Sequence, residues 1–337
     1  MIIQIIIGRN KSVSHCILHF SCNINSAAPT KTFLFLCNLF SRLSLKVQIL
    51  KMKCCYPLAI LLLIAISQPC CTKLPDGGVP VYLKIDTVNL DTNFGKYGYN
   101  SQAISDAWVQ TSTTNLGAYQ VPCEFPILQD STISFLISAG VFESGQSEIR
   151  DVYPFYSADT FTLYHAVPGK VYTHTPIFNY LPAAQIPWIE DFEFTNDYDS
   201  ITYCTNPSIV KYGRRCGQLT VSPTDSTVLA TQINQNPPWD YPTGQEIWLE
   251  LDYMAQVPFW IGFNGYYVAG GAITSVDQEQ VLFTLPQPQW THIYVKLSEI
   301  MAQVNANYYR VTFQALCPTG TAGGSVYLDN IKMVYFP

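Results

Sequence analysis

The amino-acid sequence predicts an all-β protein with two domains. The chain has 337 residues, which is enough for two domains of ordinary size. Aromatic residues make up 14% of it, including 22 Tyr and 18 Phe, and these residue types favour strands. Short alternating apolar segments are separated by Gly and Pro, as expected of β-sandwiches. Only 12% of the residues are charged, about half the usual share.

The segment 52–70 is predicted to be an export signal. It begins with Met and Lys and continues with an apolar run over 56–66, too short for the roughly 20 helical residues that span a bilayer. It ends at two cysteines and resembles the signal of a bacterial lipoprotein. We predict lipidation at Cys71, with Cys70 as the alternative, because the proline before Cys70 disfavours cleavage there. An ordinary secretory signal with incidental cysteines is the other interpretation.

Residues 1–51 precede this signal, although an export signal normally begins a chain. They contain three cysteines and no acidic residue. We interpret them as a non-native upstream extension, the alternative being an unusual targeting segment.

Charge is distributed unevenly along the chain. Residues 1–71 hold seven basic residues and no acidic one, so residues 72–337 hold all 24 acidic residues and 11 basic ones, a net charge of −13. Nucleic acids require clustered Lys and Arg. The sequence therefore argues against a nucleic-acid partner.

Residues 71–78 are predicted to be a tether and residues 79–178 the first β domain. Its strands are expected over 79–86, 104–110, 116–122, 131–139, 160–166 and 170–176. The stretch from Asp106 through a G-x-Y-x-x-P segment to Gly140 resembles PEGA-type and immunoglobulin-like domains. That resemblance implies a small β-sandwich.

Residues 179–187 are a predicted linker, and residues 188–337 form the second domain. The motif E-D-F-E at 190–193 opens it, and the motif Y-L-D-N-I at 327–331 lies near its end. This pair resembles jelly-roll carbohydrate-binding modules and galactose-binding-like domains, where the opening and closing strands lie side by side. Together the two domains resemble bacterial two-domain outer-membrane lipoproteins.

The resemblance also implies a structural calcium ion. In the resembling modules, Ca²⁺ is held by the Glu of the opening motif and the Asp of the closing motif, which correspond to Glu193 and Asp329. Calcium takes six to eight oxygen ligands, which carboxylates and loop carbonyls supply. Alternatively, Asp329 only caps a strand and Glu193 is solvated.

Strand parity predicts one outward-facing ligand platform in the second domain. Apolar residues such as Ile247, Leu249 and Leu251 face the core, and the alternate residues face outward. The candidate ligand-binding residues are Trp248, Glu250, Asp252, Trp260, Asn264, His292, Tyr294 and Arg310. Aromatic rings stack on sugars, and polar groups bond their hydroxyls. Parity leaves open whether the first domain or a loop covers this face. The loop aromatics Trp239, Tyr241, Tyr266 and Tyr267 are a second possible platform.

Glu250 and Asp252 are the candidate catalytic pair. Their carboxylates would lie roughly 6–7 Å apart on one strand, within the range that glycosidases use. The triplet resembles the E-x-D-x-x-E strand of jelly-roll glycoside hydrolases, but its last acid is missing. No G-x-S-x-G or phosphate-loop motif occurs. We therefore expect no enzymatic activity.

The four cysteines after residue 72 show no zinc-site spacing, and Cys204 and Cys216 are the closest pair. Their pairing stays open. We predict a non-catalytic cell-envelope lipoprotein, anchored in the outer membrane on an unspecified side, that binds a glycan through its jelly roll. The alternative is an accessory subunit of an outer-membrane complex that uses the same face for protein contact.

Overall fold

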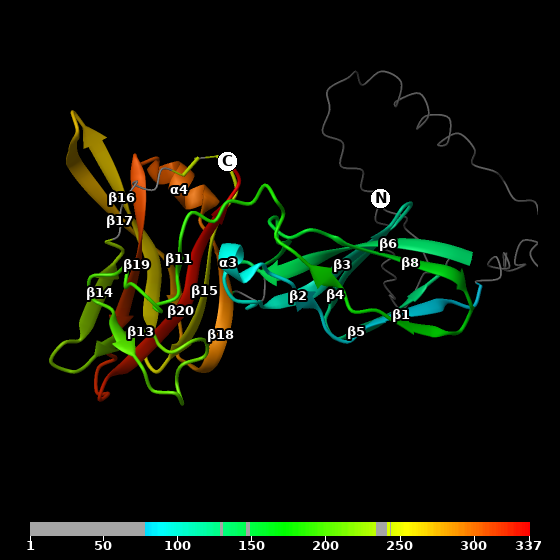
Figure 1. The fold of residues 1–337 in the computed structure, drawn as a ribbon, viewed down its shortest axis with the longest axis horizontal. Helices are drawn as coiled ribbons and strands as arrows, with labels where there is room; N and C mark the ends of the chain where they lie inside the picture. Colours follow the sequence, from blue (N-terminus) through cyan, green and yellow to red (C-terminus); the bar gives the residue numbers. More distant parts are fainter. Residues whose placement is uncertain (1–77, 129–130, 146–148, 234–240, 243) are drawn as a thin grey trace, which may run out of the picture. The chain divides into compact units, whose positions relative to one another are not determined.

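The computed structural model describes residues 78–337 except 129–130, 146–148, 234–240 and 243. The predicted signal, both candidate lipidation cysteines and most of the tether lie outside the described residues. Residues 73–337 form one compact unit. Nearly every described element is a strand, which confirms the predicted all-β class (Figure 1). Within the described part, no helix is long and apolar enough to cross a membrane.

The first domain is a β-sandwich. One sheet has the strand order β5-β1-β9, another has β4-β3-β6-β7 with β8 also paired to β6, and β10 pairs with β2. Its elements are β1 (Val81–Ile85), β2 (Asn89–Leu90), α3 (Phe94–Tyr97), β3 (Ile104–Thr111), β4 (Asn115–Gln120), β5 (Cys123–Ile127), β6 (Ser131–Phe142), β7 (Arg150–Val152), β8 (Asp159–Ala166), β9 (Val171–Thr173) and β10 (Ile177–Phe178). Apolar side chains from these strands fill one core, including Leu83, Ile133 and Phe155.

Strand β5 was not expected from the sequence because it contains Pro126. Proline lacks an amide hydrogen and is tolerated mainly at sheet edges. Here β5 is the edge strand of its sheet, paired only with β1. The position of the strand explains why the proline does no harm.

The second domain is a two-layered jelly roll. Its first sheet has the order β12-β13-β20-β15-β18, with β11 also on β20, and its second has β14-β19-β16-β17. Its elements are β11 (Ile189–Glu190), β12 (Thr202–Cys204), β13 (Cys216–Val221), β14 (Thr227–Thr231), β15 (Ile247–Ala255), β16 (Phe259–Ala269), β17 (Ala272–Thr284), β18 (Gln287–Lys296), α4 (Ser298–Val304), β19 (Tyr308–Leu316) and β20 (Gly324–Tyr335). A second core lies between the sheets and includes Ile247, Leu249 and Leu251. The predicted inward parity is confirmed.

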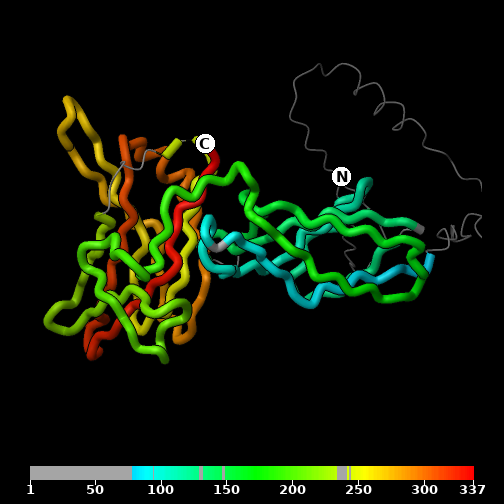
Figure 2. The backbone as a smooth tube through the Cα atoms, in the orientation of Figure 1, coloured from blue at the N-terminus to red at the C-terminus, as the bar shows by residue number. Residues whose placement is uncertain are grey.

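The opening and closing strands of the jelly roll are neighbours, as expected. Ile189 and Glu190 of β11 pair with Lys332 and Ile331 of β20. Figure 2 shows the green opening segment beside the red closing strand. The ends of the domain are thus tied together by backbone hydrogen bonds.

Strand β17 is the largest element that the sequence did not reveal. The glycines Gly270 and Gly271 connect β16 to it in a turn, with φ angles of 59° and 83°. Most side chains of β17 are exposed, because it is the edge strand of its sheet. A strand exposed on both faces has no apolar alternation to recognise.

Candidate functional site

The structure divides the eight predicted ligand-binding residues between the two sheets of the jelly roll. Five of them lie on β15 and β18 of the first sheet, namely Trp248, Glu250, Asp252, His292 and Tyr294. All five are at most 6% exposed, because the first domain covers that side of the sheet. Trp248 and Tyr294 belong to the hydrophobic core of the first domain. The structure therefore contradicts a solvent-facing platform at these five residues, since parity shows a side chain's direction but neither its sheet nor what covers it.

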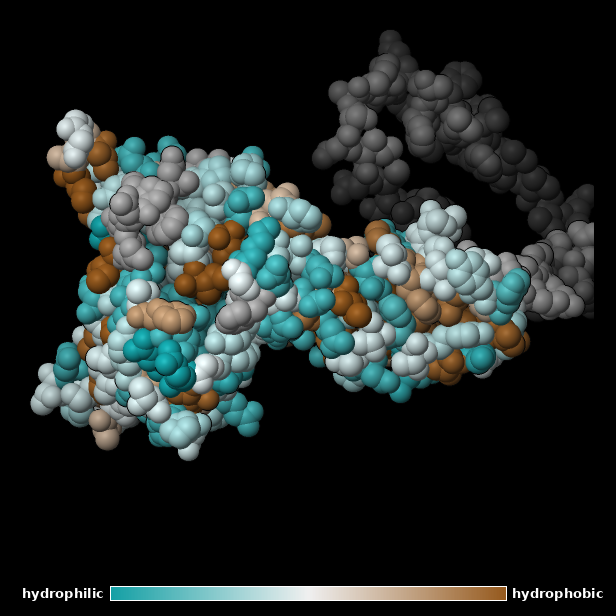
Figure 3. All heavy atoms as spheres, in the orientation of Figure 1, coloured by the Kyte–Doolittle hydropathy of each residue, from teal (hydrophilic) through white to brown (hydrophobic). Residues whose placement is uncertain are grey.

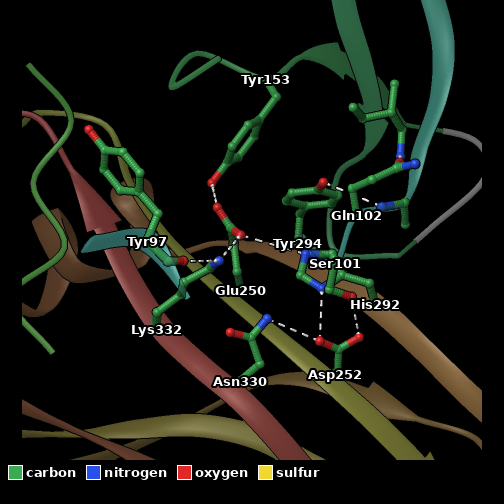
Figure 4. Close-up of polar contacts among 12 residues, drawn as sticks. Tyr97, Ser101, Gln102, Tyr153, Glu250, Asp252, His292, Tyr294, Asn330 and Lys332 are labelled. Atoms are coloured by element: carbon green, nitrogen blue, oxygen red, sulfur yellow. Dashed lines mark hydrogen bonds and ion pairs between the residues drawn. The ribbon is translucent and has the colours of Figure 1, made fainter. Parts of the chain in front are cut away.

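The covered residues form part of a buried polar group that joins the two domains, here called the interdomain cluster. It consists of Ser101, Tyr153, Tyr180, Lys211, Glu250, Asp252, His292, Asn330 and Lys332. Strand pairing places its acids and bases side by side, since Glu250 lies opposite Lys332 and Asp252 lies opposite His292. Figure 4 shows Glu250, Asp252, His292, Asn330 and Lys332 of the cluster converging, with Tyr153 and Ser101 supplied by the first domain.

Glu250 is fully buried and has four polar partners. The hydroxyl of Tyr153 donates to Oε1, and that of Tyr180 donates to Oε2 at 2.7 Å. Lys332 Nζ lies 3.3 Å from Oε2, and His292 Nε2 lies 3.6 Å from it. Burial alone would raise the pKa of Glu250, but the charge of Lys332 and the contact with His292 outweigh burial and hold that pKa at about 2.

Asp252 is equally buried and also lies among basic and hydrogen-bonding groups. Lys211 Nζ lies 2.8 Å from Oδ1, Ser101 Oγ donates to the same atom at 2.5 Å, and Asn330 donates to Oδ2 at 3.1 Å. His292 Nδ1 lies 3.6 Å from Oδ2. Burial opposes the charged form of Asp252, but His292 and Lys211 together push its pKa below the usual range. For His292, burial lowers the pKa while Asp252 and Glu250 raise it further, and the net shift is upward.

This geometry does not fit glycosidase chemistry at Glu250 and Asp252. Neither residue is exposed, so water and substrate do not reach them. A general acid of a glycosidase needs a raised pKa, whereas the pKa of each carboxyl is lowered. The ion pairs of the interdomain cluster lie within the second domain, and the hydroxyl groups of Ser101, Tyr153 and Tyr180 link them to the first domain by hydrogen bonds.

Sequence reasoning missed most of the interdomain cluster. Tyr153 and Tyr180 belong to the first domain, and no local pattern links them to Glu250. Lys211 lies in a short basic group with Arg214 and Arg215 that reads as a solvated loop, yet its ammonium pairs with Asp252. Lys332 did carry a signal, since it is a lone cation between apolar residues of the closing strand.

The predicted metal ligands Glu193 and Asp329 differ in their availability. The carboxylate of Glu193 accepts the backbone amides of Arg214 and Arg215 at 2.7 and 3.1 Å, and Arg214 Nε lies 3.3 Å from it. Asp329 Oδ1 accepts the amide of Asn330 at 2.8 Å, and its buried Oδ2 has no partner. Burial, with Asp252, Asp191 and Glu193 nearby, raises the pKa of Asp329 to about 8.

Asp329 thus fits a cation ligand better than Glu193 does, because the oxygens of Glu193 are already committed to the loop beside it. Among the described residues, no group of three or more metal-ligating side chains comes together. Calcium at this position stays a prediction.

The other three predicted residues, Trp260, Asn264 and Arg310, lie on the outer side of the second sheet. Their neighbours along β16 and β19, such as Ile261, Phe263 and Val311, point into the core. Strand pairing extends this outer side into what we call the polar–aromatic face. It consists of Trp260, Asn264, Tyr266, Gln278, Gln280, Phe283, Tyr308, Arg310, Thr312 and Gln314. The residues contributed by β17 were missed because that strand was missed.

Aromatic side chains occupy both ends of the polar–aromatic face. At one end Trp260 lies beside Phe283, with ring centroids 4.9 Å apart. At the other end Tyr266 is stacked on Tyr308 at 4.8 Å and an interplanar angle of 4°. The two ends are six residues apart along β16, or roughly 20 Å at the usual strand rise. The end with Trp260 and Phe283 offers the more open ring surface, since Phe283 is 42% exposed whereas Tyr266 is 8% exposed.

Polar groups fill the space between the aromatic ends, and two of them lack partners. Gln280 donates a hydrogen bond to Gln314. Asn264 is only 9% exposed, and neither its Oδ1 nor Arg310 Nε has a hydrogen-bond partner. Buried polar atoms are nearly always paired, so these two atoms, both closed to solvent, are exceptions within the face.

The second predicted platform of loop aromatics is not formed as a group. Tyr241 is buried, and its hydroxyl accepts a hydrogen bond from Trp188 at 3.1 Å. Tyr267 bonds to Asp277 and to the carbonyl of Val304. Tyr266 is not in a loop but on β16, and Trp239 lies outside the described residues.

Comparison with known proteins gives structural likeness only. No protein-family model matches the sequence, and no curated protein matches it. Among solved structures, the xylan-binding domain of carbohydrate-binding module family 22 is similar at 11% identity and a TM-score of 0.30, over 45% of this chain and 95% of that chain. The family 22 xylan-binding domain of Paenibacillus barcinonensis Xyn10C is similar at 10% identity and a TM-score of 0.32, over 46% of this chain and 96% of that chain. The family 11 carbohydrate-binding module of Clostridium thermocellum Lic26A-Cel5E is similar at 10% identity and a TM-score of 0.33, over 45% of this chain and 95% of that chain. At these values the likeness gives no ground for assigning a ligand.

Proposed function

We propose that this chain is a non-catalytic, lipid-anchored protein of the cell envelope that binds a glycan through the polar–aromatic face. The observation that carries the proposal is the aromatic pair Trp260 and Phe283 at one end of that face, with amide side chains and an arginine further along the same strands. Sugar rings present apolar faces to aromatic side chains and hydroxyl groups to amides. A ligand with that alternation matches this face.

The non-catalytic part of the proposal rests on the state of the carboxylates. Glu250 and Asp252 are the paired acids that the sequence offers for hydrolysis, and both are held in ion pairs beneath the first domain. The described part of the polar–aromatic face contains amides, a hydroxyl, rings and one arginine, but no carboxylate. These groups can bind a sugar, but they include no acid–base pair.

Affinity electrophoresis of the purified protein in gels containing soluble polysaccharides, supported by a glycan array, tests the proposal. The variant Trp260→Ala removes one ring surface and is expected to weaken binding about tenfold, since an aromatic contact contributes on the order of 1.4 kcal/mol. Phe194→Ala is the matched control, because Phe194 is an aromatic residue of the same domain that is 83% exposed and lies off the face.

Wild-type retardation that Trp260→Ala loses and Phe194→Ala keeps supports the proposal. If no glycan is retained, or if both variants bind as the wild type does, the face is not a glycan site.

A protein partner is the second candidate function, favoured by the edge strand β17. Its exposed hydrophobic residues include Ile273, Val276 and Phe283, which are 53%, 44% and 42% exposed. An edge strand also has backbone groups able to pair with another chain. Hydrophobic atoms on the side of the molecule shown in Figure 3 lie in small separate groups rather than in one large patch, which is less than a stable protein interface usually needs. We therefore rank the glycan first.

A further inference from the structure

Arg310 distinguishes the polar–aromatic face from a surface suited only to neutral sugars. It is the only charged side chain among the described residues that form the face. Residues 72–337 contain 24 acidic residues against 11 basic ones, so an arginine there has many carboxylates available to it. Its surroundings are therefore informative.

The other arginines of the described chain bind oxygen acceptors. Arg150 pairs with Asp106 at 2.5 Å, Arg214 pairs with Glu193 at 3.3 Å, and Arg215 donates to the carbonyl of Glu193. Within the described part of the chain, Arg310 forms no ion pair and its Nε has no hydrogen-bond partner. The described chain therefore supplies no carboxylate to this guanidinium, and Arg310 as a residue is partly exposed, although its Nε is closed to solvent.

The guanidinium is held in position by aromatic rings. Its Cζ lies 4.8 Å from the centroid of the Tyr266 ring, which is stacked on Tyr308. A guanidinium is planar and weakly hydrated, so it stacks on a ring with one surface and keeps its N–H edge free. That edge binds carboxylates through parallel hydrogen bonds.

Asn264 lies directly opposite Arg310 in the strand pairing, and its unpaired Oδ1 is an acceptor beside this donor. Asn264 Oδ1 is closed to solvent, whereas the partly exposed side chain of Arg310 can be reached by the carboxylate of a sugar. Trp260 is four residues along β16 from Asn264, or roughly 13 Å. That separation leaves room for a further sugar ring to stack there.

We propose that the polar–aromatic face is specific for a uronic-acid-containing glycan, whose carboxylate pairs with Arg310. This specificity rests on the proposed glycan-binding function and adds the chemical class of the ligand to it.

Matched polysaccharides that differ only in charge test the inference. Isothermal titration calorimetry would compare polygalacturonate with its fully methyl-esterified form, and glucuronoxylan with unsubstituted xylan. A sulfated galactan serves as the anion without a carboxylate. We expect the wild-type protein to bind at least one uronate at least tenfold more tightly than its neutral counterpart, with the difference decreasing as salt is added.

Substitutions at Arg310 identify the group responsible. Arg310→Gln is expected to abolish the preference for the uronate, so that the charged and neutral forms bind this variant with equal affinity. Arg310→Lys, which keeps the charge but not the planar fork, is expected to retain only part of the preference. An unchanged melting temperature identifies the variants that remain folded, and Asn264→Asp adds a second test by placing a repelling carboxylate beside the ligand.

The outcomes separate this inference from the proposed function. Equal affinity for charged and neutral forms, an unchanged preference in Arg310→Gln, or preference for the sulfated galactan overturns the uronate inference. If a neutral glycan still binds in a Trp260-dependent manner, glycan binding survives that result. If neither class binds, both proposals fail together.

Discussion

Replacing Lys332 with methionine tests whether the interdomain cluster holds the molecule together. Methionine is similar in length, so the change removes the charge while retaining most of the volume. Glu250 then loses the ammonium 3.3 Å from its Oε2, and the carbonyl of Tyr97 loses a donor at 2.9 Å. Removing one partner of a buried ion pair costs about 3–5 kcal/mol. Tyr153, Tyr180 and His292 stay on Glu250, which places the expected loss near 3 kcal/mol, a large part of an ordinary domain's stability.

Urea unfolding followed by tryptophan fluorescence measures this loss. The control Lys84→Met removes a lysine that also pairs with an acid, Asp86, at 2.9 Å, but on the surface. That variant is expected to unfold at the wild-type urea concentration, because exposed pairs contribute little. The double variant Lys332→Met/Glu250→Gln should be more stable than Lys332→Met alone, since it removes the charge left unpaired. If Lys332→Met unfolds at the same urea concentration as Lys84→Met, Lys332 contributes no more to stability than a surface ion pair does, and the reasoning is wrong.

Two further predictions concern protons and calcium. Glu250 has a lowered pKa of about 2, so its contribution to stability is complete above its ordinary pKa and is lost as the pH falls towards 2. His292 has a raised pKa, so its contribution is complete below its ordinary pKa and is lost as the pH rises through the raised value. Unfolding free energies measured across pH should therefore fall on both sides of a mildly acidic maximum, and an acid limb unchanged in Glu250→Gln would contradict this assignment. If calcium binds at Asp329, chelation should lower the melting temperature of the wild type but not of Asp329→Asn, since a ligand of the native state stabilises it by mass action; a wild-type melting temperature unaffected by chelation would argue against the ion.

Local patterns in the sequence were sufficient to predict the all-β class and the inward parity of several strands. Ile247, Leu249 and Leu251 alternate because one side of β15 packs into the core, and this periodicity is visible without coordinates. Gly270 and Gly271 form a turn in which both adopt positive φ angles, a conformation that glycine tolerates. The end motifs indicated neighbouring strands, which the pairing of β11 with β20 confirms. The lipid anchor, the calcium ion and the cell-envelope location stay predictions.

Tertiary structure alone decided which outward-facing residues reach solvent. Trp248 and Trp260 have the same outward parity in neighbouring strands, yet Trp248 is completely buried against the first domain whereas Trp260 lies on the opposite sheet. Parity depends on the backbone of one strand, but burial depends on contacts with segments far away in the chain. Tyr153, for example, donates to Glu250 across 97 positions of sequence. Side-chain direction could therefore be predicted from neighbouring residues, whereas accessibility required the packing of the two domains.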